Sequence, residues 1–177
     1  MDKLIPGTQK EFVNEDSVIS FFNTVGIANG LSLGQVCSIT GNEPFVIQNW
    51  VKRGYVSRPI KKRYHEKQFA RILMINSLKD AMRIEDIGRL MTLVNGDVED
   101  ESDDLISEVD LFLLLSKAVY RLDNYSSTEK IINEVMKEAN NTNEKLFTAL
   151  DIMVNGYISG RFKQEAQKNL ILLEKIK

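Results

Sequence analysis

The chain has 177 residues, 43% of them apolar and 27% charged, which is the balance of a globular protein that folds in water. Its single cysteine, Cys37, excludes an internal disulfide, and the single histidine, His65, leaves no Cys/His metal cluster. No run of about 18 apolar residues is present and the first residues hold no apolar signal core, so we expect a cytoplasmic protein without a membrane span. No nucleophile–base pair, phosphate loop or metal set is visible in the sequence. We therefore predict a protein that is not an enzyme and that holds no metal or cofactor.

The net charge of −2 hides two blocks of opposite sign. The first block, from Val51 to Arg71, contains one acid and eight cations, which are Lys52, Arg53, Arg58, Lys61, Lys62, Arg63, Lys67 and Arg71. The second block, from Asp97 to Asp110, contains no cation and eight acids, which are Asp97, Glu99, Asp100, Glu101, Asp103, Asp104, Glu108 and Asp110. A calcium loop would need a glycine where Ser102 stands. We therefore interpret the acidic block as a solvated linker whose carboxylates favour the next helix N-terminus.

The first predicted element is an amphipathic helix over residues 16–25. Its apolar residues recur at three- and four-residue steps, and they are Val18, Phe21, Phe22 and Val25. We expect this helix to pack on the part of the chain that follows.

Two short helices joined by a tight turn come next. Ser32 can cap a helix that runs to about Ile39, and Gly41 ends it because glycine adopts a left-handed backbone conformation easily. Pro44 suits the first position of a second helix, which ends before Gly54. The inward-facing residues of the two helices are Leu33, Val36, Cys37, Ile47, Trp50 and Val51. Two such helices and their glycine turn form a helix-turn-helix pattern.

The stretch from Tyr55 to Tyr64 loses the helical period, and Pro59 excludes a helix interior, so we predict a short β-wing there. Helices resume over about 66–81 and 84–94, where apolar residues again recur at helical steps.

Beyond the acidic block, four amphipathic segments predict a helical bundle. Their apolar sets are Leu111, Leu114, Leu115, Ala118, Val119 and Leu122; Ile131, Ile132, Val135 and Ala139; Leu146, Ala149, Leu150, Met153 and Val154; and Phe162, Ala166, Leu170, Leu173 and Ile176. No single apolar repeat continues for three or four heptads, so no long coiled coil is predicted.

In their order and spacing, the motifs of the first half resemble the DNA-binding head of MerR-type regulators. Residues 31–41, LSLGQVCSITG, resemble the opening helix of that head. Residues 43–54, EPFVIQNWVKRG, are similar to its recognition helix, with Trp50 at the second aromatic position. Residues 63–68 resemble the wing exit, and residues 82–87 resemble the last helix of the head.

The chain also departs from the MerR pattern. Many MerR-type recognition helices have Arg-Tyr-Tyr where this chain has Gln48, Asn49 and Trp50, which changes the contact chemistry at two positions. The wing is shorter than the family norm, and neither the C-terminal dimerisation helix nor the effector cysteines are evident. The resemblance therefore implies a DNA-binding head but no inducer and no mode of dimerisation. The whole chain looks like a member of an uncharacterised bacterial family that joins this head to its own helical tail.

We therefore predict an all-α protein with a small β-wing, in which a winged helix-turn-helix head is followed by a helical bundle. The expected parts are an N-terminal helical extension (1–30), the DNA-binding head (31–94), an acidic linker (95–103) and a helical C-terminal domain (104–177).

The candidate DNA contacts fall on the recognition helix and the wing. Gln48 and Asn49 can bond bidentately to adenine in the major groove, unless they are merely solvated. The candidate phosphate contacts, which can equally be a solvated charged face, are Lys52, Arg53, Arg58, Lys61, Lys62 and Arg63. Tyr64 can donate its hydroxyl to a phosphate or pack the wing against Trp50. Phe45 is expected as a staple or core residue, although an exposed ring can touch a thymine methyl group.

The predicted function is binding of double-stranded DNA in transcriptional control. Because one small head binds a specific site weakly, we expect a homodimer formed through the C-terminal domain. The alternative is a protein-interaction adaptor that keeps the helix-turn-helix as a scaffold and works through the helical C-terminal domain. We expect His65 as a surface or capping residue and Cys37 as a small core residue.

Overall fold

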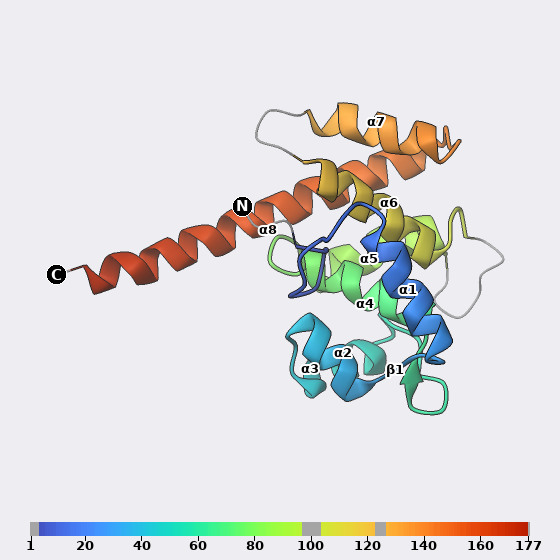
Figure 1. Ribbon diagram of the computed structural model, residues 1–177, viewed down its shortest axis with the longest axis horizontal. Coiled ribbons are helices and arrows are strands. Elements are labelled where there is room, and N and C mark those ends of the chain that lie inside the picture. The colour runs from blue at the N-terminus through green and yellow to red at the C-terminus, as the bar shows by residue number, and fades with distance from the viewer. Residues whose placement is uncertain (1–3, 97–103, 123–126, 177) are drawn as a thin grey trace.

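The computed structural model describes residues 4–96, 104–122 and 127–176, which form a mostly helical protein with one small sheet (Figure 1). Its elements are α1 (Ser17–Ile27), β1 (Leu31–Ser32), α2 (Leu33–Thr40), α3 (Pro44–Lys52), β2 (Arg63–Tyr64), α4 (Glu66–Leu78), α5 (Ile84–Asn95), α6 (Glu108–Arg121), α7 (Thr128–Glu138) and α8 (Glu144–Lys175). The expectation of a helical chain with a small β element is thereby confirmed. From Asp97 on, the predicted acidic linker (95–103) lies outside the described residues.

Local sequence signals explain where α2 and α3 begin and end. Ser32 Oγ accepts a hydrogen bond from Gln35 N and Gln35 Oε1 accepts one from Ser32 N, so a capping box begins α2. Gly41 ends α2 with a φ of 72°, a left-handed conformation in which glycine has no steric penalty. Pro44 takes the first position of α3. The predicted boundaries of both helices are confirmed to within a residue or two.

The two-stranded antiparallel sheet joins distant parts of the sequence. Leu31 of β1 pairs with Tyr64 of β2, and Ser32 pairs with Arg63. The sequence predicted β structure only over 55–64, because a strand as short as β1 has no alternating pattern of its own. The sheet thus places the residues before α2 beside the residues before α4.

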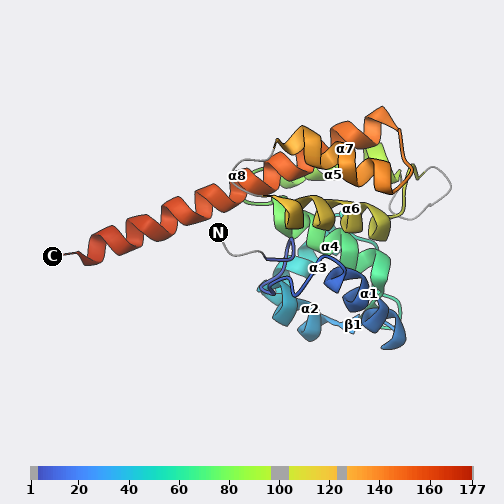
Figure 2. The same cartoon turned by 45° about the horizontal axis from the view of Figure 1, so that its top comes forward.

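The core is built around α4, in which every residue from Gln68 to Ile75 is buried. Helices α1, α5, α6 and α8 pack against it (Figure 2). The ring centre of Phe22 in α1 lies 5.8 Å from that of Phe69 in α4 and 5.6 Å from that of Phe112 in α6. The predicted packing of the first helix on the following chain is therefore confirmed.

Helix α8 is one continuous helix of 32 residues where the sequence predicted two. Its first half packs in the body, and its second half projects away from the body (Figure 1). The apolar set predicted for the first half is buried in the bundle, and its residues are Leu146, Ala149, Leu150, Met153 and Val154. The apolar set of the second half does not join the expected bundle, since Phe162 is 63%, Leu173 64% and Ile176 74% exposed. Even so, none of the helices within the described residues combines the length and the apolar character that a membrane crossing requires.

A buried ion pair connects α4 to α6. Arg71 Nη1 lies 3.1 Å from Glu108 Oε1, and the two side chains are 3% and 1% exposed. Arg71 Nε also donates a hydrogen bond of 2.7 Å to the carbonyl oxygen of Tyr55, and Lys67 Nζ lies 3.9 Å from Glu108 Oε2. Burial raises the pKa of Glu108 above its usual range, although both cations oppose the rise. The expectation of a solvated carboxylate was therefore wrong for Glu108, which begins α6 inside the core.

Glu108→Ala should destabilise the protein by about 3–5 kcal/mol, because it leaves the Arg71 guanidinium buried without its carboxylate. The paired replacement Arg71→Met with Glu108→Leu should recover most of that loss, because the cost of desolvating two charges disappears with them. Denaturant titration of each variant measures the free energies of unfolding. As a control, Asp86→Ala removes a half-buried carboxylate from two exposed partners, Arg83 and Arg89, and should cost no more than about 1 kcal/mol. A double variant as unstable as Glu108→Ala would contradict this account.

Candidate nucleic-acid interface

Helix α3 has one buried and one open face. Ile47 and Trp50 are 0% and 6% exposed and anchor the helix in the core. The open face carries exposed side chains at positions i, i+3, i+4 and i+7, which are Phe45, Gln48, Asn49 and Lys52. The structure thus leaves the side chains of both Gln48 and Asn49 exposed to solvent. Phe45 is 68% exposed, so its predicted role as a staple or core residue was wrong.

Residues 60–63 form a tight hairpin turn beside the sheet. Ile60 N donates to Arg63 O at 3.0 Å, and Arg63 N donates to Ile60 O at 2.9 Å, which closes a two-residue loop. The loop residues, Lys61 and Lys62, have φ angles of 49° and 63°, as a type I′ turn requires. Asn-Gly is the favoured pair in such a turn, and a left-handed conformation costs other residues about 1–2 kcal/mol each. Two exposed lysines therefore occupy the tip of the hairpin at a cost in stability.

Arg63, predicted as a phosphate contact, reaches back to the end of α1. Its Nε donates to Asn29 O at 2.8 Å, and its Nη2 donates to Ala28 O at 3.0 Å and Gly30 O at 2.6 Å. These carbonyls follow the last turn of α1, where helix carbonyls lack intrahelical partners and a cation is favourable. The guanidinium thus ties the hairpin to α1.

Arg53, also predicted as a phosphate contact, is held by α5. Its Nη2 lies 2.7 Å from Glu85 Oε1 and donates to Tyr55 Oη at 3.2 Å, and its guanidinium stacks 4.9 Å from the centre of the Tyr55 ring. The hydrogen bond from Arg53 lowers the pKa of Glu85. Because the two side chains are 42% and 58% exposed, the ion pair is weak and a competing anion can displace the carboxylate.

The remaining predicted site residues divide between surface and core. Lys52 and Arg58 are exposed, as are the two lysines of the hairpin. Tyr64 is 3% exposed and belongs to the buried core, and burial raises the pKa of its hydroxyl, so its ring packs inside the protein and does not face a phosphate. His65 lies directly before α4, and its backbone N donates to Gln68 Oε1 at 2.7 Å, as expected at a capping position.

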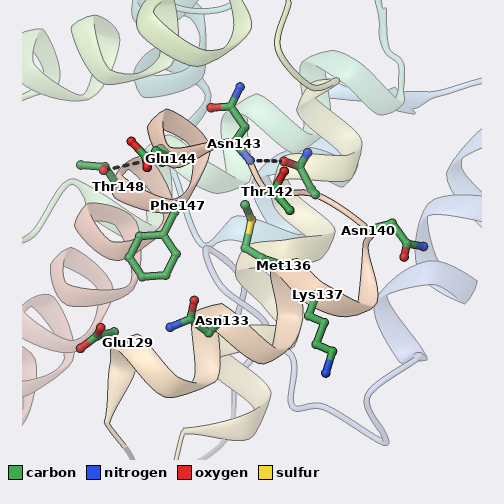
Figure 3. A pocket seen from close by; sticks show the side chains of 11 residues that line it. Glu129, Asn133, Met136, Lys137, Asn140, Thr142, Asn143, Glu144, Phe147 and Thr148 are labelled. Carbon is green, nitrogen blue, oxygen red and sulfur yellow. Dashed lines mark hydrogen bonds between the residues drawn. The ribbon is translucent and has the colours of Figure 1, made fainter.

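A hollow of about 870 Å³ lies between α7 and the start of α8 (Figure 3). Four of its eleven lining residues are asparagines, and two of these serve the local turn: Asn143 Oδ1 accepts from Lys145 N and Leu146 N and caps α8, and Asn141 Oδ1 accepts from Asn143 N. Sequence reasoning missed this hollow, for which the run Asn140–Asn143 was the only signal. Within the described residues, no group of three His, Cys, Asp or Glu side chains could hold a metal ion. Helix α7, which lines this hollow, lies on the opposite side of the molecule from α3 (Figure 1).

Comparison with known proteins places the chain among uncharacterised relatives. A family described as "Domain of unknown function (DUF1836)" matches residues 16–113, which is more than half of the chain and runs from α1 into α6. The uncharacterized protein YkrK of Bacillus subtilis (strain 168) is 27% identical over an alignment that covers 61% of this chain and 49% of that protein. The chain thus spans about half the length of the curated relative it matches. No solved structure matches the chain, and neither description names a MerR-type protein.

Arg63→Met should lower the free energy of unfolding by about 1–3 kcal/mol, since it removes a charged donor from the carbonyls at the end of α1. Arg58→Met is the matched control, because it removes the same charge from an exposed neighbour and should change stability by less than about 0.5 kcal/mol. Thermal and denaturant unfolding measure both. Equal stability of Arg63→Met and the unmodified protein would show that this arginine does not anchor the hairpin.

Proposed function

The chain belongs to the DUF1836 family, and on that premise we propose that it is a transcriptional regulator that binds double-stranded DNA through a MerR-like winged helix-turn-helix. The observation that carries the proposal is the open face of α3, where the side chains of Gln48, Asn49 and Lys52 are all exposed. With α3 as the recognition helix in the major groove, Gln48 or Asn49 would bond bidentately to adenine N6 and N7. The β1–β2 sheet with its hairpin serves as the wing.

Four exposed cations supply the contacts to the phosphate backbone, and they are Lys52, Arg58, Lys61 and Lys62. Such contacts fix the position of a protein on the duplex without reading its sequence. In this proposal Arg63 and Tyr64 act indirectly, because they hold the wing in shape. Arg53 alternates between Glu85 and a phosphate, since its exposed ion pair is weak.

The strained turn supports a role for the wing beyond folding. Lys61 and Lys62 occupy two left-handed positions where Asn and Gly would be more stable. Strain of this kind persists at functional sites, where the side chain is needed at that place. The need here is positive charge at the tip of the wing.

The paired change Lys61→Asn with Lys62→Gly separates charge from folding. The variant should be at least as stable as the unmodified protein because both residues suit a type I′ turn. Its affinity for any duplex should fall, and the slope of log affinity against log salt should decrease by about 2, or about 1 per lost phosphate contact. Fluorescence anisotropy across a salt series measures this.

Two matched controls accompany this variant. Lys61→Arg with Lys62→Arg keeps both charges and should keep the salt slope, whereas Lys130→Ala with Lys137→Ala removes two charges from α7, away from α3 (Figure 1). If the α7 variant loses as much affinity as the wing variant, the two wing lysines contribute no more to DNA binding than other surface cations do. No salt-dependent binding by the unmodified protein would refute DNA binding altogether.

The projecting half of α8 supports a homodimer as the DNA-binding form. Its exposed apolar residues lie at steps of four, four, three and three, which forms one stripe along the helix, and they are Phe162, Ala166, Leu170, Leu173 and Ile176. An exposed apolar stripe of this kind indicates a surface that binds another molecule. A second copy of the chain supplies an identical stripe, and two heads would together read a longer site than one head can.

Leu170→Glu with Leu173→Glu should convert the dimer to a monomer and weaken binding to a specific site by about 100-fold, because the two heads no longer act together. Ile171→Glu is the control, since this exposed residue lies on the opposite side of α8 and should leave the dimer intact. Light scattering gives the mass of each protein. A monomeric unmodified chain, both alone and on DNA, would contradict the dimer and favour the adaptor function, with the stripe as a surface for another protein.

A further inference from the structure

Phe45 is a large aromatic residue that is exposed to solvent in the first turn of α3. Its side chain is 68% exposed, although the residue follows Pro44 at the start of a helix whose other face anchors in the core. Single exposed apolar residues are common on protein surfaces. What distinguishes Phe45 is its position in line with the amides of Gln48 and Asn49, three and four residues further along the same face.

We propose that the Phe45 ring contacts the 5-methyl group of a thymine in the major groove and thereby selects that base. This inference rests on the proposed DNA-binding function and adds a residue to its reading surface. Residues at the N-terminal end of a recognition helix are those that reach base edges. The thymine methyl is an apolar group on the floor of the major groove, and a phenylalanine ring is one of the side chains that contact it.

The charges at the two ends of α3 favour contact of the Phe45 end with DNA bases rather than with the phosphate backbone of the DNA. Glu43, exposed at the N-cap of α3, places a carboxylate beside Phe45 and repels phosphate there. Lys52, at the other end of the helix, attracts phosphate. The ring also has no hydrogen-bonding group, so it would leave the polar edge of a cytosine or guanine without a partner.

Helix geometry places the selected thymine relative to the base that Asn49 reads. Four residues of α-helix span about 6 Å along the axis, and stacked base pairs are about 3.4 Å apart. When α3 lies along the groove, the thymine is therefore one or two base steps from the adenine contacted by Asn49.

The test removes the methyl group alone. A preferred duplex is first selected from random DNA with the full-length protein, and each thymine is then replaced in turn by deoxyuridine, which pairs identically but lacks the methyl. The unmodified protein should lose about fourfold in affinity at one thymine, the value of one buried methyl group. Phe45→Ala should bind the thymine and deoxyuridine duplexes equally. Phe45→Leu, which keeps an apolar side chain, should discriminate between them to an intermediate degree and gives a measurable ratio if Phe45→Ala binds too weakly.

Two controls keep the inference separate from the function on which it rests. Leu93→Ala shortens a comparably exposed apolar residue on α5, and Asn49→Ala removes an amide of the same α3 face, and both should keep the fourfold ratio. Salt-dependent binding with no loss at any thymine, no selected duplex at all, or a fourfold loss that persists in Phe45→Ala would each overturn the role of Phe45 and leave DNA binding in place. A protein that does not bind duplex DNA at low salt would instead refute both.

Discussion

The buried pair of Arg71 and Glu108 is the contact on which the rest of the structure depends. It joins the middle of α4 to the first turn of α6, and through the Tyr55 carbonyl it also holds the segment that leads from α3 to the hairpin. A buried charge in this position is costly without its partner, so the pair disfavours alignments of α4 and α6 that would separate Arg71 from Glu108. The helices expected as separate head and tail therefore share a core, and the open face of α3 stands on that common support.

The surface built on this core divides the cations of the basic block into two kinds. Arg63 and Arg71 hold backbone carbonyls and so position the hairpin and the segment before it. Lys61 and Lys62 do the opposite, because they strain the turn that carries them. Arg63 and Arg71 thus hold the wing and the segment before it in shape, whereas Lys61 and Lys62 lower the stability of the turn. This combination is consistent with the proposal that the tip of the wing contacts DNA.

Among the exposed apolar residues, Phe45 on α3 and the stripe on the far half of α8 are the two features for which we propose partners outside the chain. Continuity of α8 makes the second feature possible. Gly156 does not end the helix but lets it pass the end of α4, since a Cβ there would lie only 3.0 Å from Leu78 Cδ2. The two helices predicted from the apolar sets around residue 154 and residue 170 are therefore one, and its second half carries an apolar stripe beyond the body.

The sequence by itself determined the local structure, because its signals act within one helical turn. Ser32 and Pro44 begin α2 and α3, and the spacing of Ile47 and Trp50 predicted the buried face of α3, although it did not show that Phe45 lies on the open face. Only the tertiary structure decided what the charged residues do, because their partners are distant along the chain. Arg63 binds carbonyls 33 to 35 residues earlier, Arg53 meets an acid 32 residues later, and Arg71 meets one 37 residues later. A charge pattern shows that cations are present, but whether each one faces solvent or a carbonyl depends on how the helices pack.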